Sequence, residues 1–294
     1  MGTAEVVECV PNFSEGRDAA VVDAIANAIA AVPGVAVLHQ TMDGDHGRSV
    51  ITFAGSPNAV VEAAVRGVEN AVSSIDLSQH HGVHPRIGAA DVVPFVPVRG
   101  VTLADCVALA EAAGNEIWQR LGVPVYLYEA AARCEARKRL ENVRRLDAGA
   151  PDIGGPDFHP TAGAVAVGAR KFLIAWNVNL VTSDVEVAKA IARRIRASSG
   201  GFPHVKAFGL MLASRNQAQV SMNLTDFEVT SMRVVFDEIR RLAETAGVAI
   251  DASELIGLIP QAALASASAE YLQIEGFAPD RIIENRLTSL LAVE

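Results

Sequence analysis

The sequence predicts an α+β fold of two lobes, each a ferredoxin-like (split βαβ) unit. Half of the 294 residues are hydrophobic and only 5% are aromatic, which suits helices packed on sheets better than a sandwich of aromatic-rich strands. The length is sufficient for two lobes of ordinary size. The order β-α-β-β-α-β is expected twice, and such a unit covers one sheet face with helices and leaves the other face free to meet a second lobe.

The first half of the chain gives this order through periodicity and turn residues. β-Branched residues indicate a first strand, helical spacing indicates the helix that follows it, and Pro33-Gly34 ends that helix. A polar loop then joins two short strands as a hairpin, and Pro57 opens the next helix. The expected elements are strand 5–11, helix 17–32, strands 35–40 and 48–55, helix 57–74 and strand 91–98.

The middle of the chain separates the two lobes. Thr102 is the expected N-cap of a helix over 102–121, which is followed by a strand at 123–128 and an arginine-rich helix at 131–146. Residues 149–163 are so rich in glycine and proline that regular structure is not expected there. We therefore expect a domain boundary near this segment, with an N-terminal subdomain at 1–165 and a C-terminal subdomain at 166–294.

The second half repeats the order of elements without obvious residue identity. Asp184 is an expected N-cap, and alternating apolar residues indicate the strands on either side of the helix that it begins. The expected elements are strand 171–180, a helix from Asp184 to about 198, strands 204–212 and 218–224, helix 231–246 and a strand from 248.

Composition argues against several functional classes. Acidic residues outnumber basic ones by 34 to 25, so the formal net charge of −9 opposes binding to nucleic acids or anionic membranes. The N-terminus lacks the pattern of a signal peptide and the apolar runs are short, so a cytoplasmic protein is expected. The three cysteines are widely spaced and are interpreted as buried thiols rather than as metal ligands or nucleophiles.

Three histidines fall within five positions in the segment HHGVHPRIGAADVVPFVP at 80–97. Pro85 disfavours a helical conformation for His84, so an extended or turning loop is expected. Three interpretations compete at this point. An imidazole suits acid-base catalysis at neutral pH, a structural role for the loop is also consistent with the pattern, and a zinc site lacks the spacing that helical ligands require, so no metal is expected.

Other polar residues indicate a site without defining it. PNFSEG at 11–16, with Asn12 and Ser14, is most simply a capped turn that leads into a helix. Asn177 and Asn179 alternate onto one face of a strand, where their amides need each other's neighbours or a heteroaromatic ligand as partners. MDGDHGR at 42–48, which includes Arg48, is most simply a solvated hairpin loop.

Together these segments resemble the formiminotransferase domain family. The matching motifs are VECVPNFSEGRD at 7–18, HGVHPRIGAADVVPFVPVRGVT at 81–102, GVPVYLY at 122–128, VGARKFLIAWNVNL at 167–180 and AQVSMNLTDFEVT at 218–230. The resemblance implies two lobes whose sheets face each other across a folate-binding cleft, and it implies a homodimer. The implied activity is transfer of a formimidoyl group between N-formimidoyl-L-glutamate and tetrahydrofolate, the co-substrate, in histidine degradation. The alternative is a folate- or amino-acid-binding regulatory module without transferase activity.

The resemblance also assigns residues. The catalytic histidine of the family falls on His84, and Arg48 and Arg86 are expected partners for substrate carboxylates. Asn12, Asn177 and Asn179 are weaker candidates for lining the same cleft. The family's aspartate at the end of the second strand is replaced by Thr41, and Asp43 or Asp45 is the expected substitute. The folate-binding segment falls on Gly154, Gly155, Pro156, Asp157, Phe158, His159, Pro160, Thr161, Ala162 and Gly163.

Overall fold

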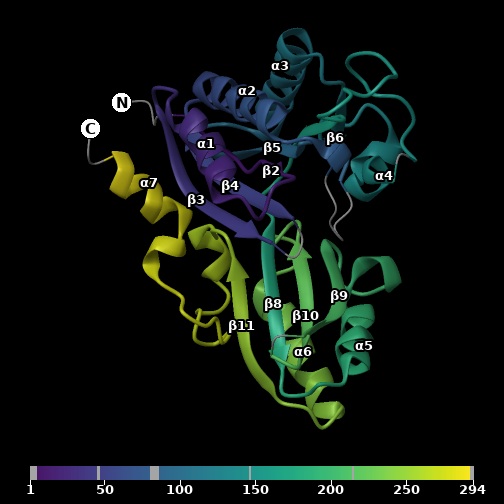
Figure 1. The fold of residues 1–294 in the computed structure, drawn as a ribbon. Helices are drawn as coiled ribbons and strands as arrows, with labels where there is room; N and C mark the ends of the chain where they lie inside the picture. The colour runs from purple at the N-terminus through teal and green to yellow at the C-terminus, as the bar shows by residue number, and fades with distance from the viewer. Residues whose placement is uncertain (1–4, 45–46, 80–85, 146, 214, 292–294) are drawn as a thin grey trace. The chain divides into compact units, whose positions relative to one another are not determined.

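A computed structural model describes residues 5–44, 47–79, 86–145, 147–213 and 215–291. The chain divides into two compact units, Met1–Arg170 and Lys171–Glu294 (Figure 1). Each unit contains a β-sheet with helices packed on it, so the expected α+β class is confirmed. The boundary expected after residue 165 falls at the first residue of a strand that pairs within the first unit.

The sheet of the first unit has the strand order β3-β4-β1/β2-β5-β7-β6, because β1 and β2 both lie between β4 and β5. Neighbours are antiparallel except that β7 runs parallel to β5 and to β6. The single strand expected at 5–11 is broken at Val10 and Pro11, because proline cannot donate to a sheet ladder. The strands are β1 (Val6–Cys9), β2 (Asn12–Phe13), β3 (Val35–Asp43), β4 (Arg48–Gly55), β5 (Ala90–Arg99), β6 (Val125–Glu129) and β7 (Val165–Ala169).

Three long helices pack on this sheet, α1 (Ala19–Ala30), α2 (Pro57–Ser74) and α3 (Leu103–Leu121) (Figure 1). Their ends follow the sequence. Asp18 accepts hydrogen bonds at the start of α1, Pro57 is the first residue of α2, and Thr102 forms a capping box with Asp105 at the start of α3. The apolar sides of the helices and strands merge into one core that includes Phe13, Ile51, Phe95 and Ile117.

One expectation for the segments beside β6 is wrong, and one strand beside β6 was not expected. The helix expected over 131–146 is a 3₁₀ helix (Glu135–Lys138) and a short α4 (Leu140–Arg144), separated at Arg139 by an extended backbone conformation. Arg137 forms an ion pair with the buried Asp152, a tertiary contact that overrides local helix propensity. Strand β7 was not expected, because its small residues give a weak strand pattern.

The second unit has the strand order β11-β8-β10-β9, with all neighbours antiparallel. Helices α5 (Val185–Ile195) and α6 (Met232–Thr245) begin at the capping side chains of Asp184 and Ser231. Their apolar sides form a core around Trp176 and Phe236. A C-terminal helix, α7 (Ile283–Leu291), was not expected. The strands are β8 (Ile174–Leu180), β9 (Val205–Leu212), β10 (Gln217–Leu224) and β11 (Ile250–Ile256).

The repeat of elements expected from the sequence is present in both units. When β1 and β2 are counted as one strand, the first strand of each unit lies between the third and the fourth, which are β4 and β5 in the first unit and β10 and β11 in the second. The second strand, β3 or β9, pairs with the third. Within the described ranges, no helix is both long enough and apolar enough to cross a membrane.

The cysteines divide into two groups. Cys9 and Cys106 are buried in the core of the first unit, as expected, whereas Cys134 is exposed, so the expectation is wrong for this residue. Burial, followed by the nearby charge of Glu8, raises the pKa of the Cys9 thiol well above its usual value. Burial raises the pKa of Cys106 to about 12. Neither thiol therefore forms the reactive thiolate at neutral pH.

This difference predicts the pattern of chemical labelling. Iodoacetamide at about pH 8 should modify Cys134 in the folded protein, and should modify Cys9 and Cys106 only after unfolding, because alkylation requires an accessible thiolate. Peptide mass spectrometry before and after denaturation measures the pattern. Rapid native labelling of Cys9 would contradict the packing described for β1.

Candidate active site

The segment PNFSEG at 11–16 contains β2 and the turn that leads toward α1, and Ser14 in this turn is hydrogen-bonded to Gly88 and Ala89. The Ser14 amide donates to the Ala89 carbonyl at 2.8 Å, and its hydroxyl donates to the Gly88 carbonyl at 2.7 Å. Glu15 Oε1 accepts from the amides of Gly16, Arg17 and Asp18 at 2.7 to 3.0 Å. The interpretation as a capped turn is therefore confirmed, and the turn also anchors residues 88–89.

The same residues are bonded to the end of the glycine and proline segment. The Ala89 amide donates to the Ala162 carbonyl at 2.9 Å, and the Ala164 amide donates to the Ile87 carbonyl at 2.8 Å. A bridge pairs Gly88 with Gly163. Because an added Cβ on Gly88 would lie 1.9 Å from the Ala164 carbonyl oxygen, only glycine allows this approach. Two segments that the sequence singles out for catalysis and folate binding are thus adjacent.

The segment 154–163 is irregular, as expected, and holds its shape through local contacts. His159 Nδ1 accepts from the Ala162 amide at 3.0 Å, which closes a turn. Gly154 has a φ of +93°, and an added Cβ there would lie 2.7 Å from the Trp118 ring. The Phe158 ring is 37% exposed and stands edge-on to Tyr126 at 6.3 Å between centroids. Phe158 therefore presents an aromatic surface to solvent.

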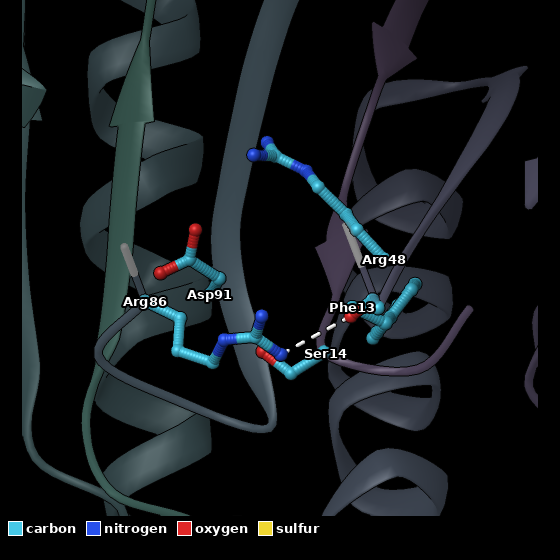
Figure 2. A pocket seen from close by; sticks show the side chains of 6 residues that line it. Phe13, Ser14, Arg48, Arg86 and Asp91 are labelled. Atoms are coloured by element: carbon cyan, nitrogen blue, oxygen red, sulfur yellow. Dashed lines mark hydrogen bonds between the residues drawn. The ribbon is translucent and has the colours of Figure 1, made fainter. Parts of the chain in front are cut away.

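A small pocket lies between these elements (Figure 2). The residues that line it belong to β2 and the turn after it, to the start of β4, and to the start of β5 with residue 86 before it. The guanidinium groups of Arg48 and Arg86 and the carboxylate of Asp91 are turned toward the same space in Figure 2. The lining residues are Phe13, Ser14, Gly47, Arg48, Arg86 and Asp91.

Both arginines of the pocket are held by neutral oxygen acceptors. Arg86 Nη1 donates to the Gly47 carbonyl at 3.1 Å, the bond drawn in Figure 2. Arg48 Nη2 donates to Asn12 Oδ1, and Asn12 Nδ2 donates in turn to the Val10 carbonyl at 2.9 Å. The simplest interpretation of residues 42–48, a solvated loop, is therefore wrong for Arg48. The hairpin itself is confirmed, and it directs this side chain into the pocket.

Burial makes these two cations suitable for binding an anion. Burial, followed by the charge of Arg144, lowers the pKa of Arg48 to about 10. Burial also lowers the pKa of Arg86. An arginine remains protonated at neutral pH under such shifts. A partly desolvated guanidinium gains most from a carboxylate, which accepts two parallel hydrogen bonds from it.

Asp91 is the acidic residue of this pocket, and sequence reasoning missed it. Its Oδ1 accepts from the Ile87 amide at 3.0 Å, and its Oδ2 accepts from Arg144 Nη2 at 2.6 Å and Nε at 3.1 Å. Asp91 appeared to be only the first residue of a strand, and Arg144 appeared to belong to an exposed basic helix. The signal available for it was an aspartate at the start of an otherwise apolar predicted strand, 91–98.

Asn177 and Asn179 lie on β8 in the second unit. As the alternation predicts, they are on the face of the strand that points away from the core, whereas Trp176 and Val178 point into the core. Asn179 is 1% exposed. It accepts from Gln219 Nε2 at 2.8 Å and donates to Glu254 Oε1 at 3.4 Å. Arg215 Nη1 donates to the same Glu254 oxygen at 3.0 Å. The partners that Asn179 requires are therefore supplied by the protein.

The other expected site residues are placed as follows. His84 and Asp45 lie outside the described residues. Thr41 is half-buried on β3, where its register partner on β4 is Val50. Asp43 is exposed at the end of β3, where its register partner on β4 is Arg48. Among the residues that the structure describes, no group of three His, Cys, Asp or Glu side chains is arranged to hold a metal ion.

Comparison with known proteins supplies the context for this geometry. Residues 6–170 match the family described as "Formiminotransferase domain, N-terminal subdomain", and residues 175–289 match "Formiminotransferase domain". A glutamate formimidoyltransferase from Streptococcus pyogenes is 43% identical over 97% of this chain and 99% of its own length. One from Thermoplasma acidophilum is 42% identical over 98% and 99%. A formimidoyltransferase-cyclodeaminase from Sus scrofa is 44% identical over 92% of this chain and 53% of its own length.

The close contact at Gly88 predicts a stability effect. Gly88→Ala should lower the free energy of unfolding by about 1 to 3 kcal/mol, because the new methyl group must displace the Ala164 carbonyl. Gly155→Ala is the matched control, since its Cβ would meet nothing within 4 Å, and it should change stability by less than about 0.5 kcal/mol. Urea unfolding measures both variants. Equal stability of the two would contradict the described junction.

Proposed function

The chain belongs to the formiminotransferase domain family, and on this premise we propose that it is a glutamate formimidoyltransferase. It transfers the formimidoyl group between N-formimidoyl-L-glutamate and tetrahydrofolate, a step of histidine degradation. The identity to glutamate formimidoyltransferases over nearly their whole length carries this proposal. The anion pocket beside the glycine and proline segment agrees with it, since the reaction requires one site for carboxylates and one for a heteroaromatic ring.

For the architecture, we propose two ferredoxin-like lobes whose sheets face each other across the folate cleft. The strand order shared by the two units supports the ferredoxin-like assignment. In the second unit, β8 and β10 place amides and hydroxyls on the face opposite the core, among them Asn177 and Ser221 as neighbours in the ladder. A polar sheet face of this kind suits the hydrogen-bonding edge of a pterin.

The carboxylates of formimidoylglutamate are the proposed ligands of Arg48 and Arg86. The pocket that these residues line is small. It therefore suits the carboxylate end of an amino acid rather than a folate. Two guanidinium groups on different elements match the two carboxylates of a glutamate moiety, and Ser14 at the pocket wall adds a hydroxyl.

The segment 154–163 is the proposed folate site. An added Cβ on Gly155 would meet nothing within 4 Å, which leaves space beside the backbone for a planar ligand, and the partly exposed Phe158 offers a stacking surface. The backbone bonds between residues 162–164 and 87–89 would place this ligand beside the end of the histidine segment.

His84 is the proposed general acid and base. N5 of tetrahydrofolate attacks the amidine carbon, and a tetrahedral intermediate forms. His84 accepts the N5 proton and returns a proton to the glutamate nitrogen, which leaves as an amine. We also propose that the protein forms a homodimer, as the family resemblance implies, and that it acts on these small molecules in the cytoplasm.

Replacement of this histidine tests the proposed function. His84→Ala should lower kcat for tetrahydrofolate-dependent transfer by about 100- to 10,000-fold, because one side chain is expected to perform both proton transfers. His80→Ala, in the same segment, is the matched control and should retain most of the activity. A spectrophotometric transfer assay with and without tetrahydrofolate measures both variants, and circular dichroism checks that they fold.

Two results would contradict this account. Full turnover by the His84 variant would exclude this histidine as the acid-base group. Saturable folate binding by the wild-type protein without transfer to any acceptor would favour the alternative, a regulatory binding module.

A further inference from the structure

We propose that Asp91 is a positioning residue for the substrate carboxylate: by accepting a hydrogen bond from the Ile87 amide while Arg144 holds it in place, it fixes the backbone that carries Arg86. The inference rests on the proposed function, because it assigns Arg86 to the carboxylate of formimidoylglutamate. It extends that function to Asp91 and Arg144, which are not among the residues expected from the family resemblance.

The contacts of Asp91 form a continuous path to Arg86. Arg144 reaches one carboxylate oxygen with both Nε and Nη2, at 3.1 and 2.6 Å. The other oxygen accepts from the Ile87 amide at 3.0 Å. The next residue back is Arg86, whose guanidinium donates to the Gly47 carbonyl at 3.1 Å. Arg86 is therefore fixed through its backbone by Asp91 and through its side chain by the β3/β4 hairpin.

The presence of an acidic side chain here requires an explanation. Asp91 lines the pocket together with Arg48 and Arg86, and a carboxylate repels a second carboxylate at short range. By charge alone, Asp91 would weaken binding of an anionic substrate. Arg144 cancels this effect, because the pair as a whole is neutral. The pair therefore provides a rigid acceptor for Ile87 with no net charge.

A purely structural role is the competing explanation, and the protein contains a matched case. Asp152 pairs with Arg137, and its Oδ2 accepts from the Leu127 amide at 2.8 Å. The two pairs have nearly the same burial, with side-chain exposures of 14% and 4% for Arg144 and Asp91 against 12% and 3% for Arg137 and Asp152. Asp152 does not line the pocket, so it reports on the loss of a buried pair alone.

Two double variants with the same net charge as the wild-type protein isolate the positioning effect. Asp91→Asn with Arg144→Met keeps an oxygen acceptor for the Ile87 amide, whereas Asp91→Ala with Arg144→Met removes it. We expect KM for formimidoylglutamate to be about tenfold higher in the alanine variant than in the asparagine variant. The kcat values and KM for tetrahydrofolate should agree within about twofold. Arg86→Met gives the effect of losing the arginine itself.

Titration with L-glutamate by calorimetry, without folate, separates this inference from the proposed function. The alanine variant should bind L-glutamate about tenfold more weakly than the asparagine variant. If the wild-type protein transfers nothing but this difference persists, the proposed function fails and the positioning role stands. Equal binding by the two variants would overturn the inference, and so would tighter binding by the alanine variant.

The matched pair and a milder substitution complete the test. Asp152→Ala with Arg137→Met should leave KM for formimidoylglutamate within about twofold of the wild-type value. An increase equal to that of the Asp91 alanine variant would indicate a general structural effect and overturn the inference. If the alanine variant does not fold, Arg144→Lys keeps the charge but not the two-point contact. It should then raise KM for formimidoylglutamate about threefold, and an unchanged KM would overturn the inference.

Discussion

The backbone hydrogen bonds between residues 87–89 and 162–164 are the constraint on which the rest of the site depends. They join the end of the histidine segment to the end of the glycine and proline segment, although the two are far apart in the sequence. Gly88 permits this junction because any larger residue would strike the Ala164 carbonyl. The turn after β2 is held to the same residues through Ser14. The proposed catalytic, carboxylate and folate segments are therefore parts of one hydrogen-bonded assembly.

The charged residues around the pocket differ in sign from the net charge of the chain. The chain carries a net charge of −9, yet the pocket beside the junction is lined by Arg48 and Arg86. Such a local concentration of cations is what a dicarboxylate substrate requires in a protein that repels anions overall. The buried acid of the pocket, Asp91, is paired with Arg144. The pocket thus brings together the cations Arg48 and Arg86, and the charge of its Asp91 is compensated by Arg144.

The sequence predicted features set by neighbouring residues better than features set by distant contacts. The caps at Thr102 and Asp184 and the hairpin of β3 and β4 follow from local chemistry, and the structure contains them. In place of the single helix expected at 131–146 the structure has a 3₁₀ helix and the short α4, and Arg137 of the 3₁₀ helix binds Asp152, a contact that local propensity does not encode. In the candidate site, Arg86 lies in a family motif, and Arg48 was singled out as a charged residue of the predicted hairpin loop. The pair of Asp91 and Arg144 was missed because the two residues are 53 positions apart.

Hydrogen exchange at the junction tests the central claim most directly. The Ala89 and Ala164 amides, which donate to carbonyls of the opposite segment, should exchange at least about 100-fold more slowly than in an unstructured peptide. Adding L-glutamate and tetrahydrofolate together should slow both amides by a similar factor, because they belong to one assembly that borders both proposed ligands. Exchange of either amide at the rate of an unstructured peptide would contradict the account, and so would a ligand response confined to one of them.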